Sequence, residues 1–424
     1  MRKAWHTLPA VSLLVGVASV AALFTATPTP AADPEAVWNQ YGGPHQDFVA
    51  PAGELASAWP AEGPRTIWSR PLGDGYSAIV VQSGRVFTMY RAGEQESIIC
   101  MNASTGKTVW EYRYDSAPRP GHAHRFGDGP RSTPLLDGGR IYTIGVAGVM
   151  HALDRETGDV IWSHDLWTEF DGNVLPHGYA SSPIAYGDTI ITLVGGTNAS
   201  IVAFDKKDGA VAWKALNFEN SYSTPRILKI GGTDQLVTFM ATELIGVDPL
   251  NGELLWQFHQ ENQYKQNVNM PTLSADGNYI FLSSPHAGAH GLKLTSSDGK
   301  TQVEEVWSEP KIQFYHVSTV REGDWVYGST GTIGPAFLTA VNIKTGKVGW
   351  RDRGFAKANC LDVGGRLMIL DEDGNLALAT ATPEGLTVHA RAALLERVAW
   401  TTPTVVGTTL FVRDKKTISA VDLS

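Results

Sequence analysis

The stretch HALDRETGDVIW, residues 151–162, returns as TAVNIKTGKVGW at residues 339–350. The two copies share an alanine, a Thr-Gly pair, a valine and a closing tryptophan. Further copies end at Trp110, Trp213 and Trp256, and two degenerate copies end at Trp307 and at His389, where tryptophan is replaced. Successive copies lie roughly 40 to 50 residues apart, which is the period typical of propeller blades.

Each copy predicts a β-hairpin. Apolar or alternating residues lead to Asp or Asn, a Thr-Gly, Asp-Gly or Asn-Gly pair turns the chain, and β-prone residues follow. Glycine supplies the positive φ that such a turn requires. We expect the tryptophan, which stands at a fixed distance after the turn, to pack between neighbouring sheets.

A second set of turns, out of phase with the first, precedes short apolar strands such as RIYTIG, TIITLV and YIFLSS. Two hairpins per repeat make a four-stranded antiparallel blade. The sequence therefore predicts an all-β fold, an eight-bladed antiparallel β-propeller. Its inner strands are expected to begin near Ser77, Ser132, Ser181, Ser223, Asn269, Val317, Asn359 and Thr401.

The eighth blade lacks a turn and an outer strand after TISAVDLS, residues 417–424. The segment RTIWSRPLG, residues 65–73, has the pattern of an outer strand and has no inner strands before it. Pairing of the two segments would close the ring and leave no long sheet edge exposed. We therefore predict a propeller over residues 65–424, preceded by an N-terminal arm over residues 33–64.

Residues 1–32 have the order of a secretory signal peptide. Two basic residues precede an uncharged apolar run that ends at Phe24, and small residues and prolines follow. Cleavage is expected between Ala26 and Ala32. The alternative is an uncleaved membrane anchor, because the apolar run is near the lower length limit for a span. No cysteine follows it to carry a lipid, and no later apolar run is long enough to cross a bilayer. We expect a periplasmic or extracellular protein.

The composition is that of a turn-rich globular chain, with 43% hydrophobic residues, 44 glycines and 23 prolines in 424 residues. A net charge of -9 without a run of Lys and Arg argues against nucleic acid or an anionic membrane surface as partner. The two cysteines, Cys100 and Cys360, are flanked by apolar residues and are predicted to be reduced core thiols. A monomer is expected.

The repeated pattern AxDxxTGxxxW resembles the PQQ-like repeat, and it covers nearly all of the chain from Arg65 onward. That superfamily includes the quinoprotein alcohol dehydrogenases, the BamB-like propellers of outer-membrane assembly, and exported bacterial propellers of unknown role. The phrases GPRSTPLLDGGRIYT, GYASSPIAYGD and YSTPRI, together with WNQYGGP in the arm, resemble the third group most. The resemblance implies that the repeated aspartate and tryptophan stabilise blades in catalytic and non-catalytic members alike.

The resemblance also implies what a quinoprotein dehydrogenase needs: a carboxylate base, Ca²⁺ held by a glutamate, an asparagine and the cofactor, and a vicinal Cys-Cys ring. Here the cysteines are far apart, and there is neither a long insertion nor a CxxCH haem domain. Asp74, Asp128 and Asp171, the acidic residues nearest to inner-strand starts, match no family motif and are expected to be solvated loop carboxylates. No cofactor is predicted, and PQQ with Ca²⁺ is the alternative.

Two histidine pairs, His122 with His124 and His286 with His290, are of the kind that binds zinc or copper. No third ligand stands at a fixed spacing, so we expect solvent-exposed loop histidines and no metal site. No catalytic nucleophile is predicted either, because the stretch GYASS, residues 178–182, lacks the GxSxG elbow.

Polar and aromatic residues stand just before the inner strands, where a propeller gathers them around one mouth of its central channel. Such a ring can stack on a planar or sugar-like group and hold an anionic one. The alternative is that the side chains satisfy backbone groups and pack the channel. These funnel residues are Tyr76, Arg131, His177, Tyr179, Tyr222, Asn269, Tyr315, His316, Asn359 and Trp400.

For function, the sequence favours an exported, non-enzymatic binding or scaffold propeller of the cell envelope, because a fold alone does not transmit chemistry. Its partner would be an envelope protein or a small or sugar-like ligand. One alternative is a PQQ-dependent alcohol or sugar dehydrogenase. A second is a carbohydrate- or polymer-binding propeller. The missing lipid anchor disfavours a docking role of the BamB type.

Overall fold

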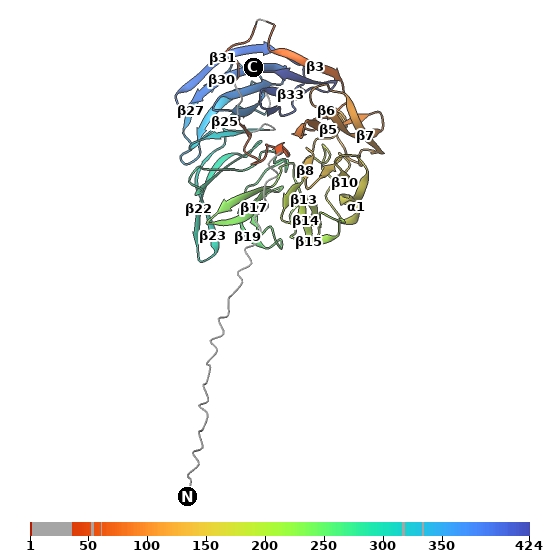
Figure 1. Cartoon of the computed structure of the whole chain (residues 1–424). Helices are drawn as coiled ribbons and strands as arrows, with labels where there is room; N and C mark the ends of the chain where they lie inside the picture. Colours follow the sequence, from red (N-terminus) through yellow and green to blue (C-terminus); the bar gives the residue numbers. More distant parts are fainter. Residues whose placement is uncertain (2–35, 52–54, 61, 316–318, 333–334) are drawn as a thin grey trace. The chain divides into compact units, whose positions relative to one another are not determined.

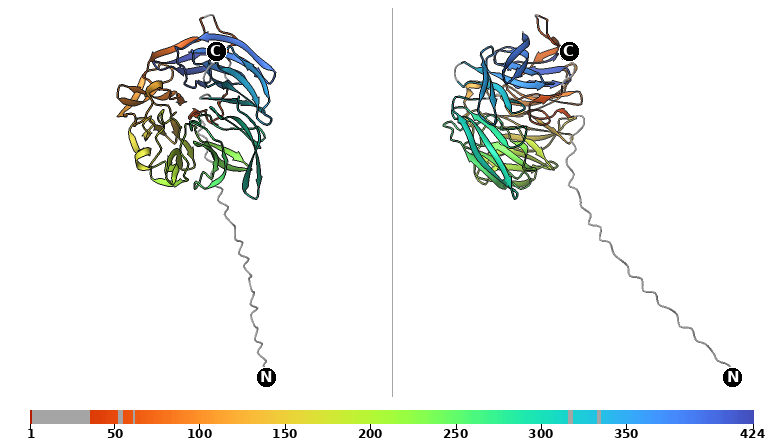
Figure 2. Two further views of the ribbon diagram at one scale, coloured as in Figure 1. Left: turned by 180° about the vertical axis from the view of Figure 1, so that it is seen from behind. Right: turned by 90° about the vertical axis from the view of Figure 1, so that its left-hand side faces the viewer.

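The computed structural model describes Met1 and residues 36–51, 55–60, 62–315, 319–332 and 335–424. The predicted signal segment therefore lies, apart from Met1, outside the described residues. From Asp33 onward the chain forms one compact unit. In its described residues, eight sheets stand around a central axis as the blades of a propeller (Figures 1 and 2). The predicted fold class is confirmed.

Each blade is built from four antiparallel strands in order, and the last of them lies at the rim. Blades 1 and 2 are β4 (Val80–Gln82), β5 (Arg85–Ala92), β6 (Gln95–Asn102) and β7 (Thr108–Asp115), then β8 (Leu135–Asp137), β9 (Arg140–Ile144), β10 (Val149–Asp154) and β11 (Val160–Asp165). Blades 3 and 4 are β12 (Ile184–Tyr186), β13 (Thr189–Gly196), β14 (Ala199–Asp205) and β15 (Val211–Ala215), then β16 (Arg226–Ile230), β17 (Thr233–Phe239), β18 (Glu243–Val247) and β19 (Leu254–His259).

The other blades follow the same order. Blades 5 and 6 are β20 (Thr272–Leu273), β21 (Tyr279–Ser284), β22 (Gly288–Ser297) and β23 (Lys300–Glu309), then β24 (Val320–Glu322), β25 (Trp325–Thr330), β26 (Phe337–Asn342) and β27 (Val348–Asp352). Blade 7 is β28 (Ala358–Val363), β29 (Leu367–Asp371), β30 (Asn375–Thr382) and β31 (Gly385–Ala393). Blade 8 is β32 (Thr404–Val406), β33 (Thr409–Arg413), β34 (Thr417–Asp422) and β3 (Arg65–Pro71). Two short helical turns, η1 (His124–Phe126) and α1 (Leu166–Glu169), interrupt the loops.

At five of the junctions, the repeated turn joins a blade to the one before it. In blade 2, the Asp154 carboxylate accepts a hydrogen bond from the Thr157 amide at 2.9 Å, and Gly158 has a φ of +79°. Trp110 of blade 1 donates its indole N–H to the Arg155 carbonyl at 2.9 Å. A Cβ at Gly158 would lie only 2.6 Å from Trp110 Cε3, so glycine is what allows the ring to cover the turn.

The predicted packing of the tryptophans between sheets is confirmed. Four further tryptophans lie over the turn glycine of the next blade: Trp68 over Gly106, Trp162 over Gly209, Trp213 over Gly252 and Trp307 over Gly346. Because the indole and the glycine belong to neighbouring blades, the same short phrase forms a turn within one blade and a contact with the next. Burial of a large aromatic ring at these five junctions stabilises the ring of blades.

Near the axis, hydroxyl side chains accept a second set of contacts between blades, which are hydrogen bonds from backbone N–H groups. The Thr133 amide donates to Ser182 Oγ at 2.9 Å, and the Ser182 amide donates in turn to Thr224 Oγ1 at 3.0 Å. These residues precede the first strands of blades 2, 3 and 4. Their backbone groups bond across blades rather than along a ladder, so blade 2 begins at Leu135 rather than near Ser132 as predicted.

The ring closes as predicted. Strand β3 pairs antiparallel with β34, from Arg65 opposite Asp422 to Pro71 opposite Thr417. A fully buried arginine, Arg413, supports this junction by donating to the Met89 carbonyl of blade 1 at 2.6 Å and to the Gly73 carbonyl at 3.0 Å. Blade 8 is thus built from both ends of the propeller sequence.

The arm crosses the centre of the ring. Strand β1 (Ala36–Trp38) pairs with β4 in blade 1, and β2 (Val49–Ala50) pairs in parallel with β28 in blade 7. Between them, the Asn39 carbonyl accepts from the backbone amide of Leu136 in blade 2 at 2.8 Å, and Gln46 Nε2 donates to the Pro225 carbonyl before blade 4 at 3.0 Å. The arm therefore contacts blades on opposite sides of the axis.

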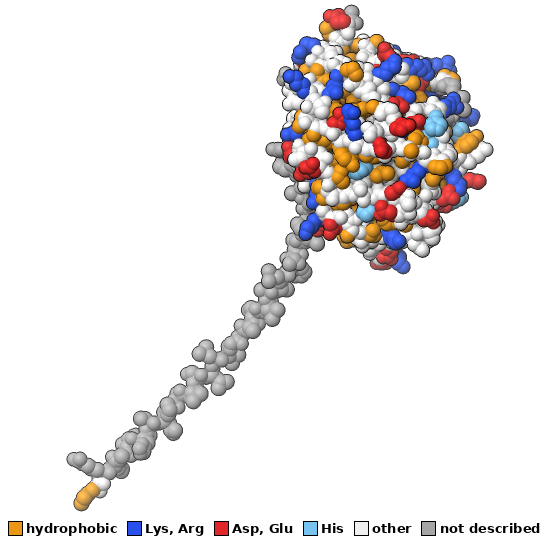
Figure 3. Space-filling model, turned by 90° about the vertical axis from the view of Figure 1, so that its right-hand side faces the viewer, with side chains coloured by type: hydrophobic (Ala, Val, Ile, Leu, Met, Phe, Trp, Pro, Cys, Tyr) orange, Lys and Arg blue, Asp and Glu red, His pale blue; other side chains and the backbone are white. Residues whose placement is uncertain are grey.

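Both cysteines are buried thiols, as predicted. Lys and Arg side chains are interspersed with Asp and Glu on the face shown in Figure 3, without a basic stripe. Within the described part of the chain, no helix has the length and apolar character needed to span a membrane.

Candidate functional site

An open cavity lies at the centre of the ring, and its empty space is about 940 Å³ when adjoining open solvent is included. Its walls come from the arm and from the segments that precede the first strands of blades 1 to 6 and 8. The described lining residues are Tyr41, Tyr76, Phe126, Arg131, His177, Ala180, Ser182, Tyr222, Thr224, Gln266, Val268, Tyr315 and Trp400.

A continuous run of rings forms one wall of the cavity. Trp400 lies 5.5 Å from Tyr76 and 5.5 Å from Phe126, between ring centroids. Phe126 lies 5.2 Å from His177, which lies 6.0 Å from Tyr222. The Tyr76 hydroxyl donates to the Phe126 carbonyl at 2.7 Å, so backbone contacts hold part of this wall in place. Such a wall offers flat apolar surface to a ring or a sugar face.

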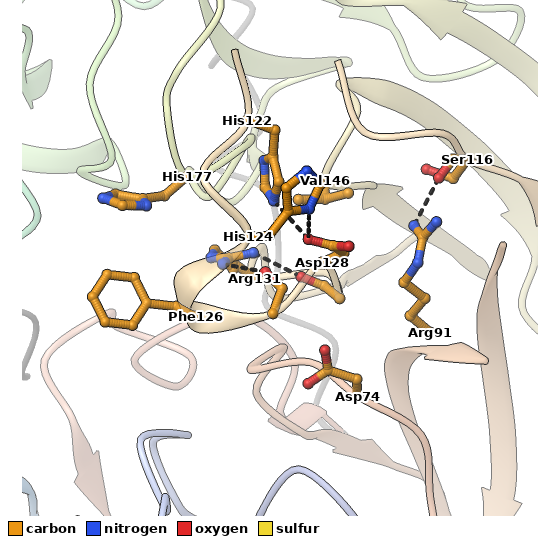
Figure 4. A network of polar contacts seen from close by, with 12 residues as sticks. Asp74, Arg91, Ser116, His122, His124, Phe126, Asp128, Arg131, Val146 and His177 are labelled. Atoms are coloured by element: carbon orange, nitrogen blue, oxygen red, sulfur yellow. Dashed lines mark hydrogen bonds and ion pairs between the residues drawn. The ribbon is translucent and has the colours of Figure 1, made fainter. Parts of the chain in front are cut away.

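Arg131 supplies the permanent charge of the cavity. Its guanidinium donates to the carbonyls of Gly129 and Gly127, both at 2.9 Å, and lies 5.6 Å from the centre of the Tyr76 ring. Figure 4 shows it beside Phe126 and His177. In the part of the chain that the structure describes, no carboxylate lies within ion-pair distance of this guanidinium, and the nearby Asp74 pairs with Lys415 at 3.1 Å. The cation is thus hydrogen-bonded and has no carboxylate in direct contact among the described residues, although the negative charges of Asp74 and Asp128 act on it from nearby.

Burial sets the protonation of the other lining groups. It lowers the pKa of His177, helped by the charge of Arg131, so this imidazole is neutral at pH 7. It raises the pKa of Tyr222 to about 12 and also raises the pKa of Tyr76, so both hydroxyls keep their protons. His177 Nδ1 is buried and has no hydrogen-bond partner among the described residues. The lining therefore combines one cation with neutral donors and acceptors.

The structure brings together six of the predicted funnel residues, namely Tyr76, Arg131, His177, Tyr222, Tyr315 and Trp400. Three do not line the cavity. Tyr179 is fully buried and donates to the Leu193 carbonyl at 2.6 Å, Asn359 donates to the Trp400 carbonyl at 2.9 Å, and Asn269 is buried beside the first strand of blade 5. His316 lies outside the described residues.

Several lining residues were not predicted. Tyr41 comes from the arm, within the quoted WNQYGGP phrase, and Phe126 ends the helical turn η1. Gln266 and Val268 precede blade 5. The Tyr41 phrase offered a signal, because an arm that crosses the ring must place side chains near its axis. Phe126 lies in a loop without a repeat, and nothing in the pattern marks it.

The expected solvated carboxylates behave in different ways. Asp171 is exposed as predicted. Asp74 is partly buried against Lys415, and Asp128 is held by His124 Nδ1 at 2.7 Å, so for these two the prediction was wrong. The folded loops bring basic partners to them that the sequence spacing does not reveal.

The lining does not fit PQQ bound with Ca²⁺ for catalysis. Ca²⁺ takes roughly six to eight oxygen ligands, usually with carboxylates among them. None of the described lining residues is Asp or Glu, so the cavity offers neither a carboxylate ligand nor a carboxylate base. No catalytic step follows from this donor set. The aromatic wall and the guanidinium suit the organic part of such a group, a planar acid, better than its metal.

We expected all four histidines of the two pairs to lie exposed in loops, and this prediction was wrong for one member of each pair. His124 and His286 are exposed, but the His122 side chain is only 3% exposed and His290 lies on strand β22 with its Nδ1 2.6 Å from Glu305. His286 packs on Tyr264 instead of joining His290, with ring centroids 4.7 Å apart. The first pair converges on Asp128 and the second pair does not converge.

A family model described as outer membrane protein assembly factor BamB matches residues 51–215 and 95–352, which together are most of the chain. The chain belongs to this BamB-like family of PQQ-repeat propellers. The quoted repeats had predicted a PQQ-like propeller, and this match confirms that prediction.

Curated relatives of this BamB-like propeller carry two kinds of name. The quinone-type alcohol dehydrogenase, dehydrogenase subunit, of Gluconobacter oxydans is 24% identical over 63% of this chain and 36% of its own length. The outer membrane protein assembly factor BamB of Shewanella oneidensis is 23% identical over 67% of this chain and 72% of its own length. The chain thus spans about a third of the first relative that it matches.

Among solved structures, BamB from Moraxella catarrhalis is similar, with a TM-score of 0.60 and 16% identity, covering 85% of this chain and 99% of that one. At this identity the likeness is one of fold alone.

Proposed function

We propose that this BamB-like propeller is an exported, non-enzymatic binding protein of the cell envelope, and that its central cavity binds a planar or sugar-like organic acid. One observation carries the proposal: Arg131 lies in an aromatic wall without a carboxylate partner among the described residues. A partly desolvated cation is costly unless an opposite charge approaches it. An anionic ligand would supply that charge.

The rest of the lining supports the same ligand class. Trp400, Phe126 and Tyr76 present ring faces on which a planar group or a sugar can stack. His177 and Tyr222 are neutral at pH 7 and can donate or accept hydrogen bonds without adding charge. A single guanidinium then selects for an acid and orients it, since arginine binds carboxylates with two parallel hydrogen bonds.

Two other functions have support of a different kind. The BamB family model and the Shewanella relative favour docking to an envelope protein, which needs no ligand in the cavity. The Gluconobacter relative favours quinone-dependent oxidation, but the described lining residues include none of the carboxylates which that chemistry requires. The signal-like residues 1–32 support export for any of the three.

The test is a calorimetric titration of the full chain with three probes: PQQ alone, PQQ with Ca²⁺, and trigalacturonate. Arg131→Met removes the charge and keeps much of the side-chain volume. Arg125→Met is the matched control, because Arg125 lies in the same loop, stacks on Phe126 at 5.2 Å and is not part of the cavity lining.

We expect at least one acid to bind without Ca²⁺, and its Kd to rise about 10-fold or more in Arg131→Met but not in Arg125→Met. Binding that requires Ca²⁺ and is accompanied by dye reduction with an alcohol would overturn the non-enzymatic assignment. If the folded protein binds none of the probes, the ligand proposal fails and docking to an envelope protein becomes the better explanation.

A further inference from the structure

A second cluster of side chains lies beside the cavity, in the loop between blades 1 and 2. Asp128 Oδ1 lies 3.1 Å from His122 Nε2 and 2.7 Å from His124 Nδ1 (Figure 4). One ligand atom from each of the three residues lies within 4.8 Å of the other two. Donors that share one zinc ion lie roughly 3 to 3.5 Å apart in tetrahedral geometry, so small side-chain shifts would complete a site.

His122 gives an independent indication that something belongs between these groups. Its side chain is only 3% exposed, and its buried Nε2 forms no hydrogen bond in the described part of the chain, although Asp128 Oδ1 is 3.1 Å away. A buried polar atom without a partner is costly. An ion between His122, His124 and Asp128 would use this nitrogen.

The cluster differs from the other contacts between histidine and a carboxylate in the described residues. His164 pairs with Glu169 at 2.7 Å, His259 with Glu243 at 3.1 Å and His290 with Glu305 at 2.6 Å, each with one imidazole per carboxylate. In the cluster, two imidazoles face one carboxylate oxygen. An ordinary ion pair needs only one imidazole for each carboxylate. Here two imidazole nitrogens and one carboxylate oxygen lie together, and these are ligand types that zinc prefers.

We propose that His122, His124 and Asp128 form a zinc site with three protein ligands and a fourth position open to solvent. The side chain of His124 is 68% exposed, which provides the path for the ion. Two neutral imidazoles and one carboxylate suit Zn²⁺, whose fourth ligand would be water. Each neutral imidazole would bind the ion through the ring nitrogen that faces Asp128 and would carry its proton on the other ring nitrogen.

The site would brace the segment that forms one side of the cavity. Phe126 stands between two of the ligands in sequence, and the carbonyls that hold the Arg131 guanidinium belong to Gly127 and Gly129, on either side of Asp128. Zinc would therefore restrict the loop that carries both a ring and the charge of the cavity. The zinc site stands on its own contacts and does not depend on which ligand the cavity binds.

The test is a titration of the chelator-treated full chain with Zn²⁺ by calorimetry, repeated with Co²⁺ and followed by its visible absorption. His124→Ala removes an exposed ligand, and Asp128→Asn removes the charge while it keeps the shape. The matched control is His164→Gln, which breaks a similar contact between histidine and a carboxylate where no third ligand is present. Circular dichroism checks that each variant is folded.

We expect one Zn²⁺ per chain, a tetrahedral Co²⁺ spectrum, and a Kd for Zn²⁺ that rises about 10-fold or more in His124→Ala and Asp128→Asn but not in the control. Hydrogen exchange of residues 120–131 should slow when Zn²⁺ is added. The proposal fails if the wild-type protein binds no Zn²⁺, or if the two ligand variants bind it as tightly as the control does.

Discussion

His151, on strand β10, is a buried histidine that forms no ion pair with any of the described residues. It is 4% exposed and packs against the rings of Tyr114 and Tyr112, with centroids 4.5 Å and 5.4 Å away. Burial lowers its pKa to about 4 from the ordinary value of 6.5. The folded state therefore holds the imidazole neutral over a pH range in which the unfolded chain protonates it.

This shift predicts a loss of stability in acid. Between pH 6.5 and pH 4 the unfolded state binds more protons at this site than the folded state does, so its contribution to the free energy of unfolding is complete above pH 6.5 and falls toward pH 4. The slope reaches about 1.4 kcal/mol per pH unit. His151→Phe should remove this part of the pH dependence, as measured by urea unfolding at several pH values.

The exposed His389 provides the control, and His389→Gln should keep the wild-type slope. Comparison of variants is needed because Asp and Glu residues add their own acid dependence. Stability curves for wild type and His151→Phe that run parallel from pH 7 to pH 4 would contradict the prediction.

At the scale of the element, the repeated contact between blades consists of a turn and the tryptophan of the preceding blade, which packs over the turn. Gly158 has a positive φ of 79° and an indole at contact distance. Gly138 has a φ of 55°, and no atom lies within 4 Å of the position that a Cβ would occupy there. The two glycines therefore separate the cost of backbone strain from the cost of the contact between blades.

Gly138→Ala should lower the free energy of unfolding by about 1 to 2 kcal/mol, the cost of a left-handed alanine. Gly158→Ala should lower it by at least about 1 kcal/mol more, because its methyl group would lie 2.6 Å from Trp110 Cε3. Chemical denaturation of the two variants measures the difference. Equal losses would show that the tryptophan does not constrain this turn.

The repeat was predictable because its Asp, Gly and Trp act at fixed distances within one phrase. The first residue of each inner strand was harder to predict. Thr133 and Ser182 use their backbone N–H groups for hydrogen bonds to the next blade, so the regular strand pairing begins a few residues later. Side-chain direction explains the partly wrong funnel. Tyr179 packs into the core, while Ala180, the next residue, lines the cavity.

At the scale of the whole molecule, closure of the ring depends on β3, a strand from the start of the propeller sequence that completes the last blade. Deletion of Arg65–Pro71 removes β3 and exposes the backbone of β34 as a sheet edge. Such an edge pairs with another chain or is lost with the blade. We therefore expect the deletion to unfold the protein or to produce oligomers in light scattering.

Arg65→Ala is the control, because it removes only the exposed ion pair with Asp422 at 2.7 Å and leaves the strand. This variant should remain monomeric with nearly unchanged stability, since surface ion pairs contribute about 0 to 1 kcal/mol. A monomeric deletion protein with the melting temperature of the wild type would refute the closure.

The pairing of β3 with β34 also sets an order of events during synthesis. Strand β3 leaves the ribosome before the other blade strands, yet its partner, residues 417–422, comes almost last. The intervening residues, 72–416, take roughly 20 to 70 s to make at about 5 to 20 residues per second. Seven blades can form while the chain emerges, but the circle cannot be completed until translation is nearly over. Closure is therefore the last step of folding, because β3 has no partner strand until the final residues of the blade sequence have been made.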